Sequence, residues 1–451
     1  MGQRQYDVIG IGIGPFNLGL AALIDGLDDS LDAAFLDQQS EFIWHEDMLI
    51  EGSTLVSSIL GDLVTPADPT NPHSFLNYLH HHDRFWEFYN YENFRIPRKE
   101  YNKYCNWVID RLDSCQFGQR VDAVRVTESG EFLIQADSTT GTGVTEYRCD
   151  DIVLGTGSQP YVPESLRGHP DDDVFHSSGY LSQRDRCLDA DTITVVGSGQ
   201  SAAEIVLDLL RKQPDNEYRI DWFTRSDGFY PVDSSKLTRE LRSSDYMEYF
   251  YDLPQETSEE RVDQQDLLYK GIAPDTSAAI YNTLYHYSVD EDPDIGMLAK
   301  TEVESIGAGS GDTYQLQCHQ WEEDERFCHE SEVVILGTGY RRTIPEFLEL
   351  VREHIKFAGE NQFEIGENFE VETRGLDGSI FAQNRGFHEH GFNTADLSLG
   401  AYQAGTIINE ILGEEVYKVG QGDRFQSFGT DQFLEQSSQS GRIEEIPLSS
   451  D

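Results

Sequence analysis

Two glycine-rich turns, one in each half of the chain, are the residues best suited to chemistry. Each turn follows an apolar stretch typical of a buried strand and precedes a helix-like segment. Glycines there let the backbone approach a diphosphate, and the N-terminus of the next helix stabilises its negative charge. Two such turns predict two dinucleotides and a redox enzyme that passes a hydride between them. The turns contain Gly10, Gly12, Gly14 and Pro15, and Gly197, Gly199 and Ser201.

Each turn is followed by a residue that can contact the ribose of a dinucleotide. Asp37 ends the strand after the first turn, where an acidic residue accepts hydrogen bonds from ribose hydroxyls. Arg225 ends the strand after the second turn, where arginine can pair with the 2′-phosphate of NADP. An ordinary exposed surface arginine explains Arg225 equally well. Pro15 replaces the usual third glycine and suits the first helical turn.

The elements that must position these turns predict an α/β fold. We expect two Rossmann-like dinucleotide-binding domains and a small helical insertion that is rich in tyrosine. Such an aromatic stripe more often forms a core than a substrate site. The expected first domain spans residues 1–180 and 340–419, the second spans 181–235 and 300–339, the helical insertion spans 236–299, and a disordered acidic tail spans 420–451.

Acidic residues dominate the composition. The 451 residues include 33 basic and 82 acidic ones, which gives a formal net charge of −49. Nucleic acid and anionic membranes are poor partners for such a surface. Because ~1 M salt shortens the screening length to ~3 Å, we interpret the charge as a halophile's salt-adapted surface. A hydrophobic content of 38% argues against a disordered protein.

The sequence also bears on compartment and metal binding. No secretory signal opens the chain and no run of 18 apolar residues occurs, so we expect a cytoplasmic protein. The six cysteines form no Cys-x-x-Cys pair, which argues against a disulfide reductase. Cys318-His319 and Cys328-His329 could form a zinc site, but they lie on an expected hairpin with an acidic loop, and we favour no metal.

Beyond these turns, an ordered set of segments resembles the lysine/ornithine N-monooxygenase family, the flavoproteins that hydroxylate amines for hydroxamate siderophores. The resemblance covers about residues 5 to 412. Single segments are weak evidence, but their order is specific. The segments are 10–20, Phe42-Ile-Trp-His-Glu-Asp-Met-Leu49, 62–79, 96–101, His176-Ser-Ser-Gly-Tyr180, 225–231, Gln383-Asn384, His390-Gly391 and Asp396-Leu-Ser-Leu399.

The resemblance implies an FAD domain, an NADPH domain and a small substrate-binding subdomain. It implies that NADPH and molecular oxygen convert a primary amine, on L-lysine, L-ornithine or a related diamine, into a hydroxylamine. A homo-oligomer is compatible with the sequence. The implied FAD residues are Gly10, Gly12, Gly14, Pro15, Asp37, Trp44, His45, Met48, Asp396 and Leu397; the NADPH residues are Gly197, Gly199, Ser201 and Arg225; the substrate residues are Asn71, Ser398 and position 61.

Two positions depart from the family pattern. Gly61 stands where the family carries a lysine that contacts the substrate carboxylate, and Val56 replaces a glutamine beside the flavin. Losing a charge-assisted hydrogen bond costs ~1.5–3 kcal/mol for a substrate that bears a carboxylate. One hypothesis is that the substrate is a decarboxylated diamine such as diaminopropane. The alternative is that another residue replaces the lysine.

Two further interpretations remain open at this point. A general flavin monooxygenase would act on sulfides or ketones, although Gly168 and His176 are too far apart for that group's Gly-x-x-x-His pattern. A non-catalytic flavoprotein would serve as a redox sensor or assembly partner. The two intact glycine turns argue against this last interpretation.

Overall fold

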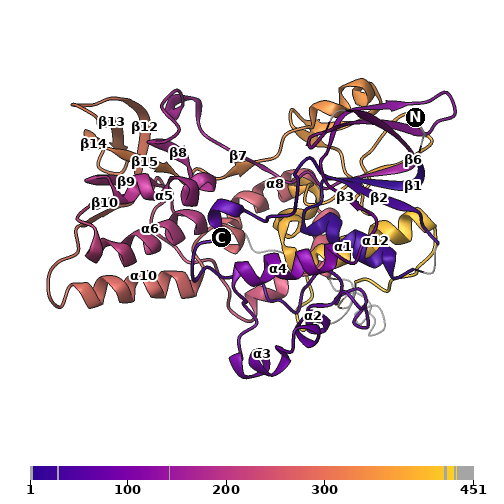
Figure 1. Ribbon diagram of the computed structural model, residues 1–451, viewed down its shortest axis with the longest axis horizontal. Coiled ribbons are helices and arrows are strands. Elements are labelled where there is room, and N and C mark those ends of the chain that lie inside the picture. The colour runs from indigo at the N-terminus through magenta and orange to yellow at the C-terminus, as the bar shows by residue number, and fades with distance from the viewer. Residues whose placement is uncertain (1–3, 28–29, 142, 421–423, 431–432, 434–451) are drawn as a thin grey trace, which may run out of the picture.

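The computed structural model describes residues 4–27, 30–141, 143–420, 424–430 and 433. Two lobes, each built on a sheet, lie side by side (Figure 1). The chain passes between them through β7 (Gln159–Pro160), which pairs antiparallel with β16 (Tyr340–Arg341). The expected α/β class with two Rossmann-like units is confirmed. In the described residues, every helix is too short or too polar to cross a membrane.

The first sheet is built around β1, whose residues Val8 and Ile9 are fully buried. β1 runs parallel to β2 on one side and to β6 on the other. Helices α1 (Pro15–Asp25) and α12 (Gly400–Leu412) share a core on one face of this sheet. In spatial order the strands are β3 (Cys115–Gln116), β2 (Ala33–Leu36), β1 (Arg4–Ile11), β6 (Val144–Leu154), β5 (Phe132–Ser138) and β4 (Gln119–Val126), with β19 (Ile380–Ala382) paired to the end of β6.

The second sheet is parallel at each of its strand pairs. Helices α6 (Gln200–Lys212) and α10 (Pro274–Tyr287) bury their apolar residues against one face. An antiparallel sheet covers the opposite face. The parallel strands, in spatial order, are β11 (Ile295–Leu298), β10 (Arg219–Phe223), β9 (Thr192–Val196), β15 (Val333–Leu336) and β8 (Val174–His176); the covering strands are β12 (Thr301–Ala308), β13 (Tyr314–Gln320) and β14 (Glu325–Ser331).

Further helices pack around the two sheets. Tyr246, Phe250 and Phe392 form a small separate core among them, and Tyr269 packs on it. The tyrosines of the expected aromatic stripe therefore divide between core and surface: Tyr246 is buried, whereas Tyr281 and Tyr285 are exposed. The helices are α2 (Phe75–His81), α3 (Phe85–Tyr91), α4 (Arg98–Ile109), α5 (Tyr180–Leu188), α7 (Ser244–Tyr251), α8 (Gln255–Gln264), α9 (Asp266–Tyr269) and α11 (Phe387–His390).

The strand pairings differ from the expected domain ranges in two places. β8 lies within residues 1–180, yet it pairs with β15 of the second sheet. β11 and α10 lie within residues 236–299, yet they complete the second sheet and its helical layer. Both strands are short, and β11 contains a glycine, so the sequence gives little periodicity to mark them.

The acidic tail also differs in part from the expectation of disorder. Arg424 pairs with Asp245 at 2.7 Å, and the ring of Phe428 lies 4.9 Å from that of Tyr246 on α7. Residues 424–430 therefore pack on the helical region. The rest of the tail beyond Gly420, apart from Phe433, lies outside the described residues.

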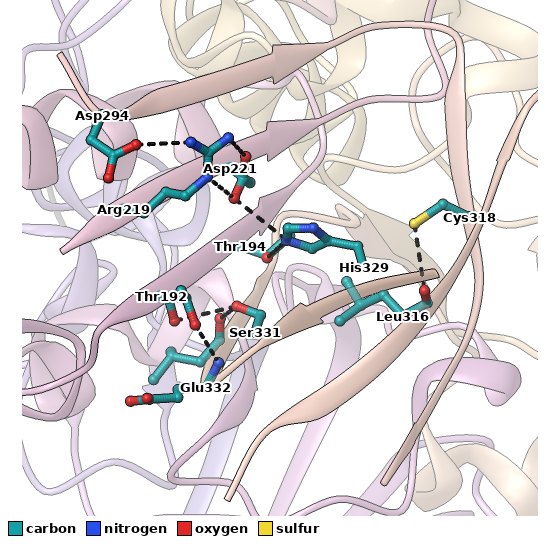
Figure 2. Close-up of polar contacts among 11 residues, drawn as sticks. Thr192, Thr194, Arg219, Asp221, Asp294, Leu316, Cys318, His329, Ser331 and Glu332 are labelled. Atoms are coloured by element: carbon teal, nitrogen blue, oxygen red, sulfur yellow. Dashed lines mark hydrogen bonds and ion pairs between the residues drawn. The ribbon is translucent and has the colours of Figure 1, made fainter. Parts of the chain in front are cut away.

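A polar network joins the second sheet to the antiparallel sheet (Figure 2). Arg219 donates two hydrogen bonds to the buried carboxylate of Asp221, at 2.8 and 2.9 Å, and a third to Asp294. The ring of His329 reaches Thr194 at 3.1 Å. His329 is therefore engaged within the fold, and in the described part of the chain no group of three or more metal-ligating side chains gathers.

Asp221→Asn is expected to lower the free energy of unfolding by about 1–3 kcal/mol, because it removes the charge of a buried carboxylate that accepts two hydrogen bonds from Arg219. Asp294→Asn is the matched control, since Asp294 binds the same Arg219 from the exposed side and should change stability by less than about 1 kcal/mol. Urea unfolding of both variants measures the difference. Equal losses would contradict this view of the network.

Candidate active site

A cavity of about 1320 Å³ lies between the first glycine turn, the loop after β2 and the helical region. It brings together most of the residues expected to hold FAD, from segments far apart in the sequence. Val56, one of the two positions expected to depart from the family pattern, also lines it. The expected site residues on its wall are Gly12, Gly14, Pro15, Asp37, Trp44, His45, Asp396 and Leu397.

The first turn is held in a conformation that needs glycine. Gly12 has φ +91°, and a Cβ there would lie 2.7 Å from the carbonyl oxygen of Gly155. Gly14 caps the N-terminus of α1, which leaves the first helical N–H groups facing the cavity. Gly10 instead packs on the ring of Phe35, where a Cβ would lie 2.2 Å away. Gly10 therefore serves the approach of β1 to β2 and is absent from the cavity wall.

Asp37 is fixed at the carboxyl end of β2. One of its oxygens accepts a hydrogen bond from the backbone N–H of Ile13 at 2.7 Å, and the other accepts from Gln39 at 2.8 Å. These bonds tie the acidic residue to the glycine turn. They hold a carboxylate on the cavity wall where a ribose would lie in a Rossmann unit.

Trp44 and His45 form an aromatic corner of the cavity. Their rings meet edge to face at 5.0 Å, and Trp44 also contacts Tyr101 at 5.1 Å. His45 faces the open cavity, yet the surrounding protein desolvates it and, with Arg98, lowers its pKa to about 4. His45 is therefore neutral at physiological pH.

Two expected residues lie elsewhere. Met48 is 2% exposed and packs in the core of the second sheet with Ile50 and Phe175 rather than lining the cavity. Asn71 is buried beneath the end of α1, where its side-chain oxygen accepts from the N–H of His73 at 2.9 Å. Its geometry gives Asn71 a structural role, away from the cavity wall.

Asp396 forms the centre of a tight cluster beside the helical region. One oxygen accepts hydrogen bonds from Ser57 at 2.9 Å and from the hydroxyl of Ser398 at 2.8 Å. The other oxygen lies 3.3 Å from the guanidinium of Arg242. Arg242 therefore neutralises the charge of Asp396, and both residues line the cavity.

Gly61 and Ser398 lie in direct contact behind this cluster. A Cβ on Gly61 would lie 2.5 Å from the Cβ of Ser398 and 2.7 Å from its Cα. Neither residue lines the cavity, although Leu397, next to Ser398, does. Residue 61 thus has no room for a side chain, because a Cβ there would displace the turn that carries Ser398.

The second glycine turn lies outside the main cavity. Gly197 has φ +120°, and a Cβ there would lie 2.3 Å from the carbonyl oxygen of Gly337. Gly199 caps the N-terminus of α6 and faces open space, and Ser201 lies in the first turn of that helix. Arg225 follows β10 with an exposed side chain, and its carbonyl accepts from the indole of Trp321 at 3.1 Å.

Arg98, which is absent from the site residues expected from the sequence, connects the two lobes. Arg98 on α4 lines the cavity and pairs with the buried Glu204 of α6 at 2.8 Å. Burial raises the pKa of Glu204, while Arg98 opposes that shift. Gln200 on α6 hydrogen bonds to the same carboxylate at 2.7 Å and also lines the cavity. The helix of the second turn is thereby anchored to the wall of the first lobe's cavity.

The chain matches a known protein family over most of its length. The family described as L-lysine 6-monooxygenase/L-ornithine 5-monooxygenase matches residues 4–342. The chain belongs to this family. The expected class of enzyme, a flavin-dependent N-hydroxylating monooxygenase, is confirmed, and the alternative of a sulfide or ketone monooxygenase loses its support.

Named relatives of this monooxygenase cover nearly its whole length. Putrescine N-hydroxylase of Shewanella oneidensis is 40% identical over 94% of this chain and 84% of the relative. The rhizobactin siderophore biosynthesis protein RhbE of Rhizobium meliloti is 38% identical, covering 95% and 96%. The FAD-bound cadaverine monooxygenase DfoA of Erwinia amylovora superposes with a TM-score of 0.91 at 35% identity, covering 95% of this chain and 99% of that one.

Proposed function

We propose that this monooxygenase N-hydroxylates one terminal amine of a short aliphatic diamine, with FAD, NADPH and molecular oxygen, for hydroxamate siderophore biosynthesis. The observation that supports the choice of substrate is the contact between Gly61 and Ser398, which leaves no room for a side chain where the resemblance expects a carboxylate-binding lysine. Arg242, a cation on the cavity wall beside this contact, is already paired with Asp396. A diamine has no carboxylate that needs such a partner. Two relatives named for putrescine and cadaverine support the same substrate class.

The cavity residues fit a flavin dinucleotide. Gly12 and the N-terminus of α1 would receive its diphosphate, Asp37 a ribose, and Trp44 and His45 its ring systems. When bound, FAD supplies the oxygen-activating chemistry, which amino acid side chains cannot supply. The chain's own part is to bind, orient and exclude water.

The wall on the helical side suits an amine that must lose its proton. Tyr269 and Phe392 stack at 6.0 Å and line the cavity with Val232. A primary amine has a reference pKa of about 10.4, and an aromatic, poorly hydrated wall favours its neutral form. The neutral form keeps the nitrogen lone pair free for oxidation, and a wall that excludes water would limit the loss of oxidant as hydrogen peroxide.

The second turn would hold NADPH, with Arg225 at the 2′-phosphate. Arg225→Ala is expected to raise the KM for NADPH roughly 10- to 150-fold and to leave the KM for NADH unchanged, because only NADPH carries that phosphate. Arg352→Ala, which removes an exposed charge from the first lobe, is the matched control. An equal rise in the KM for NADPH and for NADH would show that Arg225 does not bind the 2′-phosphate.

A substrate panel tests the choice of amine. The measurement is kcat/KM for hydroxylamine formation from diaminopropane, putrescine, cadaverine, L-ornithine and L-lysine, at high salt. The proposal expects the diamines to exceed the amino acids of equal chain length by roughly 10-fold or more, since the carboxylate of an amino acid would lack the lysine partner that the resemblance expects at residue 61. A preference for L-lysine or L-ornithine would overturn it. Absence of hydroxylamine from every amine in the panel would also overturn the proposed substrate class.

A further inference from the structure

Arg385 is a buried cation on the cavity wall with unused hydrogen-bonding capacity. It follows β19, is 5% exposed, and lines the cavity beside Thr156 and Asn384. Its Nη2 donates to the hydroxyl of Thr156 at 3.1 Å, and its guanidinium carbon lies 5.5 Å from the ring centre of Phe363. Its Nε is buried and donates to no acceptor in the described part of the chain.

A second arginine, Arg342, holds the backbone next to Arg385 in place. Arg342 donates to both the backbone carbonyl and the side-chain oxygen of Asn384, the residue that precedes Arg385. The guanidinium of Arg342 also lies 4.9 Å from the ring centre of Phe387. Burial lowers the pKa of each arginine to about 10, and Arg342 contributes to the shift of Arg385. Both side chains remain cations at neutral pH.

These cations have no carboxylate partner. Across the residues that the structure describes, no ion pair involves Arg342 or Arg385, although the chain carries 82 acidic residues. A buried charge is costly unless a counter-charge and hydrogen bonds satisfy it. An arginine kept without a carboxylate partner on a cavity wall is therefore suited to an anionic ligand, and its planar fork matches phosphate oxygens.

The location of Arg385 identifies the anion. Its partner Thr156 directly follows Gly155, whose carbonyl oxygen packs on Gly12 of the first turn. The Cα of Thr156 itself would lie 3.3 Å from a Cβ on Gly12. Through Thr156, the guanidinium is therefore tied to the segment that packs on the first turn, and the helix that follows this turn favours negative charge.

We propose that Arg385 is a diphosphate-binding residue of the main cavity: carried by Thr156 and supported by Arg342 and Asn384, it binds a diphosphate oxygen of the dinucleotide held at the Gly12 turn. This inference rests on the proposed function, because it needs a dinucleotide in the cavity. In the proposed function the diphosphate at that turn is that of FAD; binding of the NADPH diphosphate by Arg385 instead is the alternative that the measurement below detects.

The test is flavin binding to the full-length chain freed of flavin by dialysis, followed by fluorescence. Arg385→Met is expected to raise the Kd for FAD roughly 10- to 150-fold and to leave the Kd for riboflavin unchanged, because riboflavin lacks phosphate. An unchanged Kd for FAD with a raised Kd for NADP⁺ on the FAD-loaded variant would assign the diphosphate to NADPH. Arg326→Met is the charge-matched control, since Arg326 is exposed on β14.

Several results would overturn the inference. They are equal weakening of FAD and riboflavin, unchanged Kd values for both dinucleotides, or selective loss of amines that carry a carboxylate. Thermal unfolding without flavin gives a second measurement: removing an uncompensated buried cation should keep or raise Tm, whereas a purely structural role predicts a fall. If the unaltered chain binds neither FAD nor NADP⁺, the proposed function itself fails. If it binds them and Arg385→Met binds equally well, only this inference fails.

Discussion

Replacing Gly12 with alanine is expected to weaken FAD binding roughly 5- to 150-fold. Gly12 has φ +91°, a conformation that costs other residues about 1–3 kcal/mol. The new Cβ would also lie 2.7 Å from the carbonyl oxygen of Gly155, which is backbone and cannot rotate away. The turn must therefore shift at the point where the diphosphate would approach. Fluorescence titration of FAD measures the loss, and hydroxylamine formation at limiting FAD should fall with it.

Gly307→Ala provides the control for this variant. Gly307 lies on β12, its φ is not positive, and a Cβ there meets no atom within 4 Å. It should bind FAD as the unaltered chain does. Retention of full FAD affinity by Gly12→Ala would contradict the assignment of the main cavity to the flavin.

Replacing Gly197 with alanine is expected to raise the KM for NADPH by a similar factor, roughly 5- to 150-fold, with the FAD content unchanged. Gly197 has φ +120°, and its Cβ would lie only 2.3 Å from the carbonyl oxygen of Gly337. The strain falls on the second turn, which lies outside the main cavity. Stopped-flow reduction of the enzyme-bound flavin over a range of NADPH concentrations measures the effect.

The two glycine variants should therefore separate the two coenzymes. Gly12→Ala changes FAD affinity first, whereas Gly197→Ala changes hydride supply in an enzyme that still holds FAD. The same Gly307→Ala control applies to both. Loss of FAD from Gly197→Ala, or normal NADPH kinetics in that variant, would be inconsistent with separate sites.

Local patterns account for what the sequence predicts well. A buried strand, a glycine turn and a helix start are adjacent in the chain, so both Rossmann-like units are visible without knowledge of the fold. Asp37 is predictable for the same reason, because it ends the strand that follows the first turn, and the structure places it on the cavity wall.

Side-chain direction in irregular segments is much harder to predict. Met48 and Asn71 lie in a long stretch without periodicity. Tertiary contacts bury the side chain of Met48 in the core of the second sheet and that of Asn71 beneath α1. The contact between Gly61 and Ser398 joins distant parts of the chain. The sequence marks Gly61 as a departure, but only the fold shows that its position is closed.

Arg98 and Arg385 are both absent from the site residues expected from the sequence, but they differ in how far the sequence could have indicated them. Arg98 lies within the 96–101 segment that carries part of the family resemblance, so the sequence marked this segment as one that could contribute to the site. Nothing in the sequence shows that Arg385 is buried without a carboxylate, because burial and pairing are properties of the packed chain. Buried, unsatisfied polar groups are found by examining every donor in the structure.

The coupling of NADPH oxidation to hydroxylamine formation tests the central claim most directly. The assay would supply FAD, NADPH and oxygen at high salt and measure hydroxylamine and hydrogen peroxide together, with putrescine, cadaverine and diaminopropane as substrates. We predict that one diamine gives hydroxylamine as the main product, close to one molecule for each NADPH oxidised. Peroxide as the main product with every diamine, alongside hydroxylamine from L-lysine or L-ornithine, would contradict the account.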